Sequence, residues 1–281
     1  MILSLASGKG GTGKTTLSVA LARAVSESVS YLDCDVEEPN GHLFLRPDIT
    51  QTETVSVPIP IVDESICTAC GQCVDFCQFN AIVVPGKSAI VFPEMCHGCG
   101  GCAKVCPADA ITEGRYPVGE VEIGTSGKIR VVQGRLNVGA SIAPPVIKAV
   151  KKKIIDDELT IIDCPPGSAC PMIAAVTDSD YVILVTEPTP FGLHDLKIAV
   201  ATMRELALPF GIAINRFDIG DDRVENYCQE EKLDVLIRIP NLLLIAETCS
   251  RGDDLLMAVP TIKDDLLGAL RFITDQQRRC S

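Results

Sequence analysis

Residues 8–15 have the composition and spacing of a loop that binds the phosphate groups of a nucleotide. The run Gly8-Lys9-Gly10-Gly11-Thr12-Gly13-Lys14-Thr15 matches the pattern G-x-x-x-x-G-K-[ST]. Glycines let backbone N–H groups turn toward an anion, the lysine reaches the β- and γ-phosphates, and the threonine hydroxyl binds Mg²⁺. An unliganded glycine-rich turn is the alternative, but such a turn requires neither Lys14 nor Thr15. We therefore expect ATP or ADP with Mg²⁺ to be bound by Gly8, Gly10, Gly11, Thr12, Gly13, Lys14, Thr15 and Thr16.

Eight of the fourteen cysteines form two runs, each with the pattern C-x₂-C-x₂-C-x₃-C. Pro107 follows the second run, whereas Gln78 follows the first. In the bacterial ferredoxin pattern, which these runs resemble, the fourth thiolate of each run binds the cluster of the other run. We therefore expect two [4Fe-4S] clusters with crossed ligation, one held by Cys67, Cys70, Cys73 and Cys106 and the other by Cys96, Cys99, Cys102 and Cys77.

Structural zinc is the main alternative for the cysteine runs, because four thiolates also suit tetrahedral Zn²⁺. Zinc sites, however, usually group their cysteines in separated pairs rather than in runs of four. Disulfides are expected in oxidising compartments, and no secretory signal peptide is recognisable at the start of this chain. Iron–sulfur ligation in the cytoplasm is therefore the interpretation that we favour.

Apolar runs alternate with amphipathic segments over most of the chain. Strands are expected at 2–6, 29–32, 159–162, 181–185, 210–214 and 235–239, and helices at 14–25, 145–153, 193–206 and 262–276. This alternation predicts an α/β fold with a mostly parallel sheet and helices on both faces. Asp33 and Asp35 come at the carboxyl end of the second strand, where open α/β sheets present ligand-binding groups. Helix capping or a turn is the alternative role for any single aspartate at such a place.

The composition changes between residues 58 and 117, where the two cysteine runs lie among short β-branched segments. Residues 118–139 are again rich in glycine and β-branched side chains, which favours strands that return to the main sheet. We therefore expect a P-loop domain in two parts, residues 1–57 and 118–281. An inserted α+β domain of the bacterial ferredoxin type is expected at residues 58–117.

The overall composition argues against several classes of partner. The chain has 281 residues, 47% of them hydrophobic, and a net charge of −12 from 37 acidic and 25 basic residues. Nucleic-acid affinity depends largely on Lys and Arg, so we expect no nucleic-acid partner. Every long apolar run is interrupted by charge or proline well before the roughly 20 residues that a spanning helix needs, so we expect no integral membrane association.

Lys9, within the phosphate loop, adds a resemblance to a known family. The loop is similar to the deviant Walker A group of P-loop ATPases, which includes MinD, ParA, the nitrogenase iron protein and Mrp. The resemblance implies a nucleotide-sandwich dimer in which Lys9 acts on the partner subunit's nucleotide, as an arginine finger does. The dimer would be a homodimer or a heterodimer with a paralogous ATPase. A solvated loop lysine is the alternative for Lys9.

The same resemblance implies roles for residues outside the loop. Residues 161–167, Ile-Ile-Asp-Cys-Pro-Pro-Gly, look like the Walker B and switch II segments of the family. Asp163 would hold Mg²⁺ through water, and Gly167 would lie near the γ-phosphate. Asp35 would position the attacking water, with Asp33 in support. The residues implied to contact adenine are Asn215, Arg216 and Pro240, although Asn241 stands where an acidic residue is expected.

Three functions follow from the combined motifs. The first is an ATPase whose nucleotide state gates electron transfer through the two clusters to a redox or metallocofactor partner protein. The second is an assembly or carrier ATPase for iron–sulfur or metal clusters, as in the Mrp type, although this chain lacks the C-x-x-C that such carriers have near the C-terminus. The third is a MinD-like positioning switch with structural clusters, although the last expected helix mixes acidic with basic residues.

Overall fold

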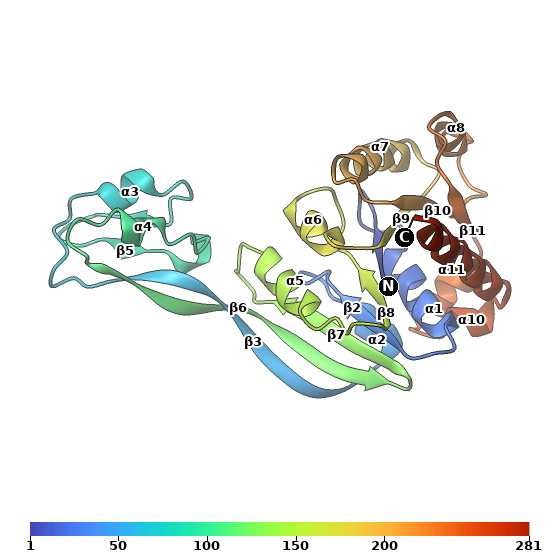
Figure 1. Ribbon diagram of the computed structural model, residues 1–281, viewed down its shortest axis with the longest axis horizontal. Helices are drawn as coiled ribbons and strands as arrows, with labels where there is room; N and C mark the ends of the chain where they lie inside the picture. Colours follow the sequence, from blue (N-terminus) through green and yellow to red (C-terminus); the bar gives the residue numbers. More distant parts are fainter. Residues whose placement is uncertain (281) are drawn as a thin grey trace.

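A nine-stranded sheet forms the centre of the larger part of the molecule (Figure 1). The computed structural model describes residues 1–280, with the side chains of residues 1–278. The strands of this sheet are β1 (Ile2–Ala6), β2 (Val29–Asp33), β3 (Asp48–Val62), β6 (Ile111–Ser126), β7 (Ile129–Leu136), β8 (Leu159–Asp163), β9 (Tyr181–Thr186), β10 (Phe210–Asn215) and β11 (Val235–Ile239). Their order is β11-β10-β9-β1-β8-β2-β7-β6-β3. The pairs β7–β6 and β6–β3 are antiparallel, and all the other neighbouring pairs are parallel.

Helices cover both faces of the sheet. One face packs against α5 (Pro144–Lys151), α6 (Cys170–Val176), α7 (Pro190–Glu205) and α8 (Arg223–Glu230). The other face packs against α1 (Lys14–Ala24), α2 (Gly41–Leu45), α9 (Leu243–Ser250), α10 (Leu255–Ala258) and α11 (Thr261–Cys280). Because side chains alternate along a strand, Leu3 and Leu5 of β1 enter the core beneath α1, whereas Ala6 enters the opposite core. Burial on both faces explains why the central strands are nearly continuous apolar runs.

The expected α/β sheet with helices on both faces is confirmed. Each strand and helix expected from the sequence is present, with bounds that differ by at most four residues. The antiparallel edge formed by β3 was not predicted, because residues 48–54 are mostly polar and exposed. No helix within residues 1–280 is both long and apolar enough to cross a membrane.

A long ribbon of β3 and β6 extends from the sheet and carries a small unit at its far end (Figure 1). The unit consists of residues 63–110 and contains α3 (Gln72–Phe76), β4 (Ile82–Val83), β5 (Ile90–Val91), the 3₁₀ turn η1 (Pro93–Met95) and α4 (Gly101–Lys104). Its Cys73, Ile82 and Ala89 form a buried apolar cluster with Ile111 of β6. Residues 58 and 117, the expected domain edges, lie within the ribbon, whose pairing continues to Val62 and Ile111.

Candidate functional site: a nucleotide cavity and two cysteine cavities

The phosphate loop connects β1 to α1 and is braced by Asn215 from the end of β10. Gly13 has φ 92°, which favours glycine, and a Cβ placed there would lie 2.4 Å from Nδ2 of Asn215. The same Nδ2 donates a hydrogen bond of 2.8 Å to the carbonyl oxygen of Thr12. Glycine is therefore required at position 13 both by its backbone conformation and by the closeness of Asn215.

One cavity at the carboxyl edge of the parallel strands gathers most of the predicted nucleotide-binding residues. It is lined by predicted residues from four segments, namely Gly10, Gly11, Gly13, Lys14, Thr15, Thr16, Asp35, Asn215, Arg216 and Pro240. Gly8, Lys9 and Thr12 line a separate, narrow space between the loop and α7 instead. Gly167 lines neither space, but its N–H donates to the carbonyl oxygen of Ser7 at the start of the loop.

Asp163 lies at the floor of this region and is completely buried. Its Oδ2 accepts hydrogen bonds from the hydroxyls of Thr15, at 2.5 Å, and Tyr31, at 3.3 Å. Its Oδ1 is buried and has no hydrogen-bond partner among the described residues. Burial raises the pKa of Asp163, while Lys14 and Thr15 act in the opposite direction. A buried carboxylate with a free oxygen beside a threonine hydroxyl fits a Mg²⁺ ion, which prefers oxygen ligands and retains several waters.

Asp33 and Asp35 have different environments although they are two residues apart. Asp33 is fully buried, and its carboxylate accepts the N–H groups of Gly41, at 3.0 Å, and Asp35, at 3.1 Å. Asp33 therefore fixes the backbone that follows β2. Asp35 lines the nucleotide cavity, and burial raises the pKa of its carboxyl to about 6, with Lys14 opposing the shift. This pKa suits a group that exchanges a proton near neutral pH.

Lys9 pairs with Glu187, a residue that the sequence analysis did not single out. Glu187 directly follows β9, is only 8% exposed, and also accepts from Arg216 Nη1 at 3.0 Å. One carboxylate thus joins the phosphate loop to the residue after β10. The sequence signal that could have found Glu187 is an acidic residue at the end of an apolar strand.

The nucleotide cavity also has apolar lining residues. Phe44, Leu242, Ile245 and Leu255 line it beside Pro240. The backbone N–H of Asn241 donates to Oδ1 of Asp218 at 2.6 Å. Asp218 thereby supplies a carboxylate that holds the Pro240 loop, even though position 241 itself is not acidic.

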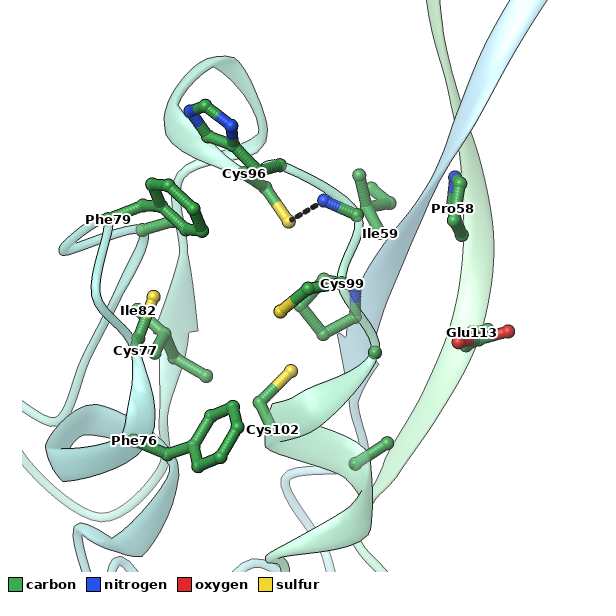
Figure 2. Close-up of a pocket in the computed structure, with 16 residues that line it drawn as sticks. Pro58, Ile59, Phe76, Cys77, Phe79, Ile82, Cys96, Cys99, Cys102 and Glu113 are labelled. Carbon is green, nitrogen blue, oxygen red and sulfur yellow. Dashed lines mark hydrogen bonds between the residues drawn. The ribbon is translucent and has the colours of Figure 1, made fainter. Parts of the chain in front are cut away.

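The eight clustered cysteines line two cavities in the small unit. The first cavity is lined by Cys67, Cys70, Cys73 and Cys106. The second is lined by Cys77, Cys96, Cys99 and Cys102, and Figure 2 shows their sulfur atoms facing a common space. Each cavity therefore receives three cysteines from one run and the fourth cysteine from the other.

The surroundings of the second cavity are mostly apolar. Phe76, Phe79 and Ile82 contribute to its wall (Figure 2), and the N–H of Gly98 donates to Sγ of Cys96 at 3.4 Å. Burial raises the pKa of the Cys102 thiol here, and of the Cys73 thiol in the first cavity. In the described part of the chain, no group of three or more Cys, His, Asp or Glu side chains is arranged to hold a single metal ion.

Comparison with known proteins identifies the larger part of the molecule. Residues 3–255 match the family described as the CobQ/CobB/MinD/ParA nucleotide binding domain. Two uncharacterized proteins of Methanocaldococcus jannaschii are similar in sequence. MJ0579 is 30% identical over 232 residues, which cover 80% of this chain and 83% of that protein. MJ0578 is 34% identical over 221 residues, which cover 77% and 78%.

Solved structures extend the likeness of fold to nearly the whole chain. MinD from Pyrococcus horikoshii, complexed with Mg-ADP, superposes with a TM-score of 0.53 and 23% identity, covering 97% of this chain and 92% of that chain. A ParA family ATPase from Chlorobium tepidum gives a TM-score of 0.59 with 13% identity and coverage of 96% and 97%. The match over residues 3–255 and the P-loop between β1 and α1 agree, and the chain belongs to the CobQ/CobB/MinD/ParA family of P-loop nucleotide-binding proteins.

Proposed function

We propose that this protein is an ATP-hydrolysing iron–sulfur protein in which the nucleotide state controls electron transfer through two [4Fe-4S] clusters. The observation that carries the proposal is the sorting of eight cysteines into two cavities of four, in the crossed combination that two-cluster ferredoxins use. A ferredoxin-type unit on the β3–β6 ribbon would thus share one chain with a MinD-type nucleotide site. Bound [4Fe-4S] clusters would supply one-electron transfer.

We favour a [4Fe-4S] cubane over zinc at each set of four cysteines. Tetrahedral Zn²⁺ needs four ligands at about 2.0–2.3 Å from one point. A cubane binds each thiolate at a different iron, so its four ligands stand around a volume. The four sulfur atoms of the second cavity face a common space (Figure 2), which supports this choice.

The nucleotide site contains the groups that phosphoryl transfer to water requires. Lys14 and the loop N–H groups would bind the phosphates, while Thr15 and Asp163 would hold Mg²⁺. Asp35, whose pKa is raised to about 6, lies in the same cavity and would orient the attacking water and accept its proton. Lys9 would act on the nucleotide of a second ATPase subunit, either an identical chain or a paralogue.

A line of contacts joins the nucleotide site to the second cysteine cavity and supports coupling between them. The carbonyl oxygen of Val36, next to Asp35, accepts the N–H of Leu136 at 2.7 Å. Five residues later, the hydroxyl of Ser141 donates to the carbonyl oxygen of Glu94 at 2.5 Å. Glu94 lies in η1, two residues before Cys96. A movement of the segment after β2 on nucleotide binding would therefore reach the loop that carries Cys96.

Anaerobic reconstitution with iron and sulfide tests the proposal. We expect about eight irons per chain and a cluster reduction potential that differs between ADP and a non-hydrolysable ATP analogue. The Lys14→Ala variant is the control, because it should bind iron normally and lose the nucleotide effect. Reconstituted protein that contains no iron would contradict the proposal. So would a cluster reduction potential that is the same with ADP and with the ATP analogue in the wild type as well as in the variant.

The same measurements separate the two other functions. A carrier ATPase would transfer its iron to an apo-ferredoxin on ATP hydrolysis, so its iron content would fall. A positioning switch would bind anionic vesicles in the ATP state while its clusters remained oxidised and unresponsive. An iron content that survives repeated turnover, together with a nucleotide-dependent potential, is expected here.

A further inference from the structure

Glu187 is the meeting point of two cations that come from different parts of the nucleotide site. Lys9 reaches it from the phosphate loop, and Arg216 reaches it from the segment after β10, at 3.0 Å. The Glu187 side chain is 11% exposed, compared with 29% for Lys9 and 45% for Arg216. The carboxylate is thus nearly enclosed, while both of its partners retain access to solvent.

Lys9 in this pairing does not line the nucleotide cavity of its own subunit. It lines the narrow space between the loop and α7 with Thr186, Gly192 and Asp195. Lys14, by contrast, lines the nucleotide cavity together with Arg216. Lys9 must therefore leave Glu187 before it can reach a nucleotide in another subunit.

Arg216 makes the departure of Lys9 feasible. Removing one partner from a buried ion pair is costly because the other charge is left uncompensated. Glu187 has a second cation, so its charge remains paired after Lys9 leaves. Arg216 has φ 51° and follows Asn215, which is anchored to Thr12, so its backbone is fixed relative to the phosphate loop.

We infer that Glu187 is a positioning residue that holds Lys9 in its own subunit, and that Arg216 keeps Glu187 paired when Lys9 crosses to the partner. Lys9 release then accompanies formation of the ATP-bound dimer. This inference rests on the proposed sandwich dimer and is independent of the iron–sulfur clusters.

Dimerisation measured by analytical ultracentrifugation, with a saturating non-hydrolysable ATP analogue, tests the inference. In Glu187→Gln the charge pair is lost and Lys9 is free, so the midpoint protein concentration for dimerisation should fall about three- to tenfold. In Lys9→Ala/Glu187→Gln the gain should disappear, because it depends on Lys9. The matched control is Glu231→Gln, which breaks a surface pair with Arg204 of 2.8 Å and should leave the midpoint unchanged.

For Arg216→Gln we expect the opposite change in the dimerisation midpoint. Glu187 would then have Lys9 as its one remaining ion-pair partner in the described structure, so Lys9 should be held more firmly and the dimerisation midpoint should rise. Nucleotide affinity of the monomer is measured separately, because Arg216 lines the nucleotide cavity. If Glu187→Gln does not fold, as judged by thermal melting, the Arg216→Gln shift decides the question alone.

The outcomes distinguish this inference from the proposal on which it rests. A wild-type protein that remains monomeric with the analogue overturns both. A wild-type protein that dimerises, with a midpoint that Glu187→Gln leaves unchanged or raises, overturns the role of Glu187 alone. The same holds if Arg216→Gln lowers the midpoint.

Discussion

Thr15, the last residue of the phosphate-loop motif, donates a 2.5 Å hydrogen bond to Oδ2 of Asp163 at the end of β8. The first turn of α1 is thereby joined to β8, the neighbouring strand of β1. The other carboxylate oxygen of Asp163 is buried and has no partner among the described residues. Since a buried polar atom without a partner is costly, we interpret this oxygen as kept for the water shell of Mg²⁺.

Asp163→Asn should separate metal binding from stability. Burial raises the pKa of this carboxyl, so its ionised form is disfavoured in the folded state at pH 7. The neutral amide should therefore raise the melting temperature of the nucleotide-free protein. It should also remove the additional stabilisation that Mg-ATP gives over ATP with a chelator, measured by thermal melting.

The control for this prediction is Asp221→Asn, the same chemical change at an exposed carboxylate that pairs with Arg223. It should leave the Mg²⁺-dependent shift intact. A normal Mg²⁺-dependent shift in Asp163→Asn would contradict the assigned metal role.

Gly13→Ala should be much more damaging than the same substitution at another glycine with positive φ. At Gly13 the new Cβ would lie 2.4 Å from Nδ2 of Asn215, whereas at Gly127, with φ 58°, nothing lies within 4 Å. Backbone strain alone costs about 1–2 kcal/mol at either site. We expect Gly127→Ala to lose only that amount in denaturant unfolding, and Gly13→Ala to lose more and to bind ATP weakly. Equal losses of stability would show that Asn215 moves aside freely.

The pH dependence of ATP hydrolysis should report Asp35. Burial raises its pKa to about 6, Lys14 opposes the shift, and Asp163, Glu38 and Glu37 add to it. The charged form is the one that can accept a proton, so kcat/KM should fall about tenfold per pH unit below pH 6. Mg-ATP binding over the same pH range is the control, because the nucleotide also titrates. An unaltered pH profile in a still active Asp35→Asn variant would exclude Asp35 as the titrating group.

Ionisation of Asp35 should favour ATP hydrolysis but lower the stability of the folded protein. A carboxyl whose folded-state pKa lies above its unfolded value destabilises the protein when it is ionised. The destabilisation that ionised Asp35 causes should therefore decrease as the pH falls from about 7 toward 4. The difference in unfolding free energy between wild type and Asp35→Asn, measured at several pH values, should shrink over this window.

The parts of the site that could be predicted from the sequence are those in which neighbours in the chain do the chemistry. The phosphate loop is of this kind, and so are the three cysteines that each run contributes to its own cavity. The positions of Asp33 and Asp163 at strand ends were also foreseeable from buried apolar runs. Their adjacency was not, because it comes from the register of β2 against β8, which pairs these two residues.

The contacts made by Glu187 and Asp218 could not be predicted for the same reason. Each depends on a partner from another strand end or loop, Lys9 and Arg216 for Glu187 and the Asn241 N–H for Asp218. The β3–β6 ribbon was missed because an exposed two-stranded ribbon lacks the one-sided apolar pattern of a covered strand.

The crossed cysteine sets predict which cluster each substitution affects. Cys106→Ser should disturb the cluster proposed at Cys67, Cys70 and Cys73, although Cys106 belongs to the other run. Cys77→Ser should disturb the second cavity, where Cys77 lies with Cys96, Cys99 and Cys102. Mössbauer or EPR spectra of the two variants should therefore lose different signals. The same signal lost by Cys106→Ser and by a second-cavity variant, Cys99→Ser, would contradict the crossed assignment.

Ser141→Ala should weaken communication between the nucleotide site and the second cysteine cavity without changing either site. The hydroxyl of Ser141 is the hydrogen-bond donor to the Glu94 carbonyl, and the Glu94 side chain is held in turn by the hydroxyl of Tyr116 at 3.3 Å. Amide hydrogen exchange of residues 93–98 should differ between ADP and the ATP analogue in the wild type, and this difference should be reduced in the variant. Ser250→Ala, which removes a helix-terminal hydroxyl bond to Glu247, is the matched control. A nucleotide response that persists in Ser141→Ala would mean that coupling travels along the β3–β6 ribbon instead, because the ribbon is the covalent connection between the sheet and the small unit.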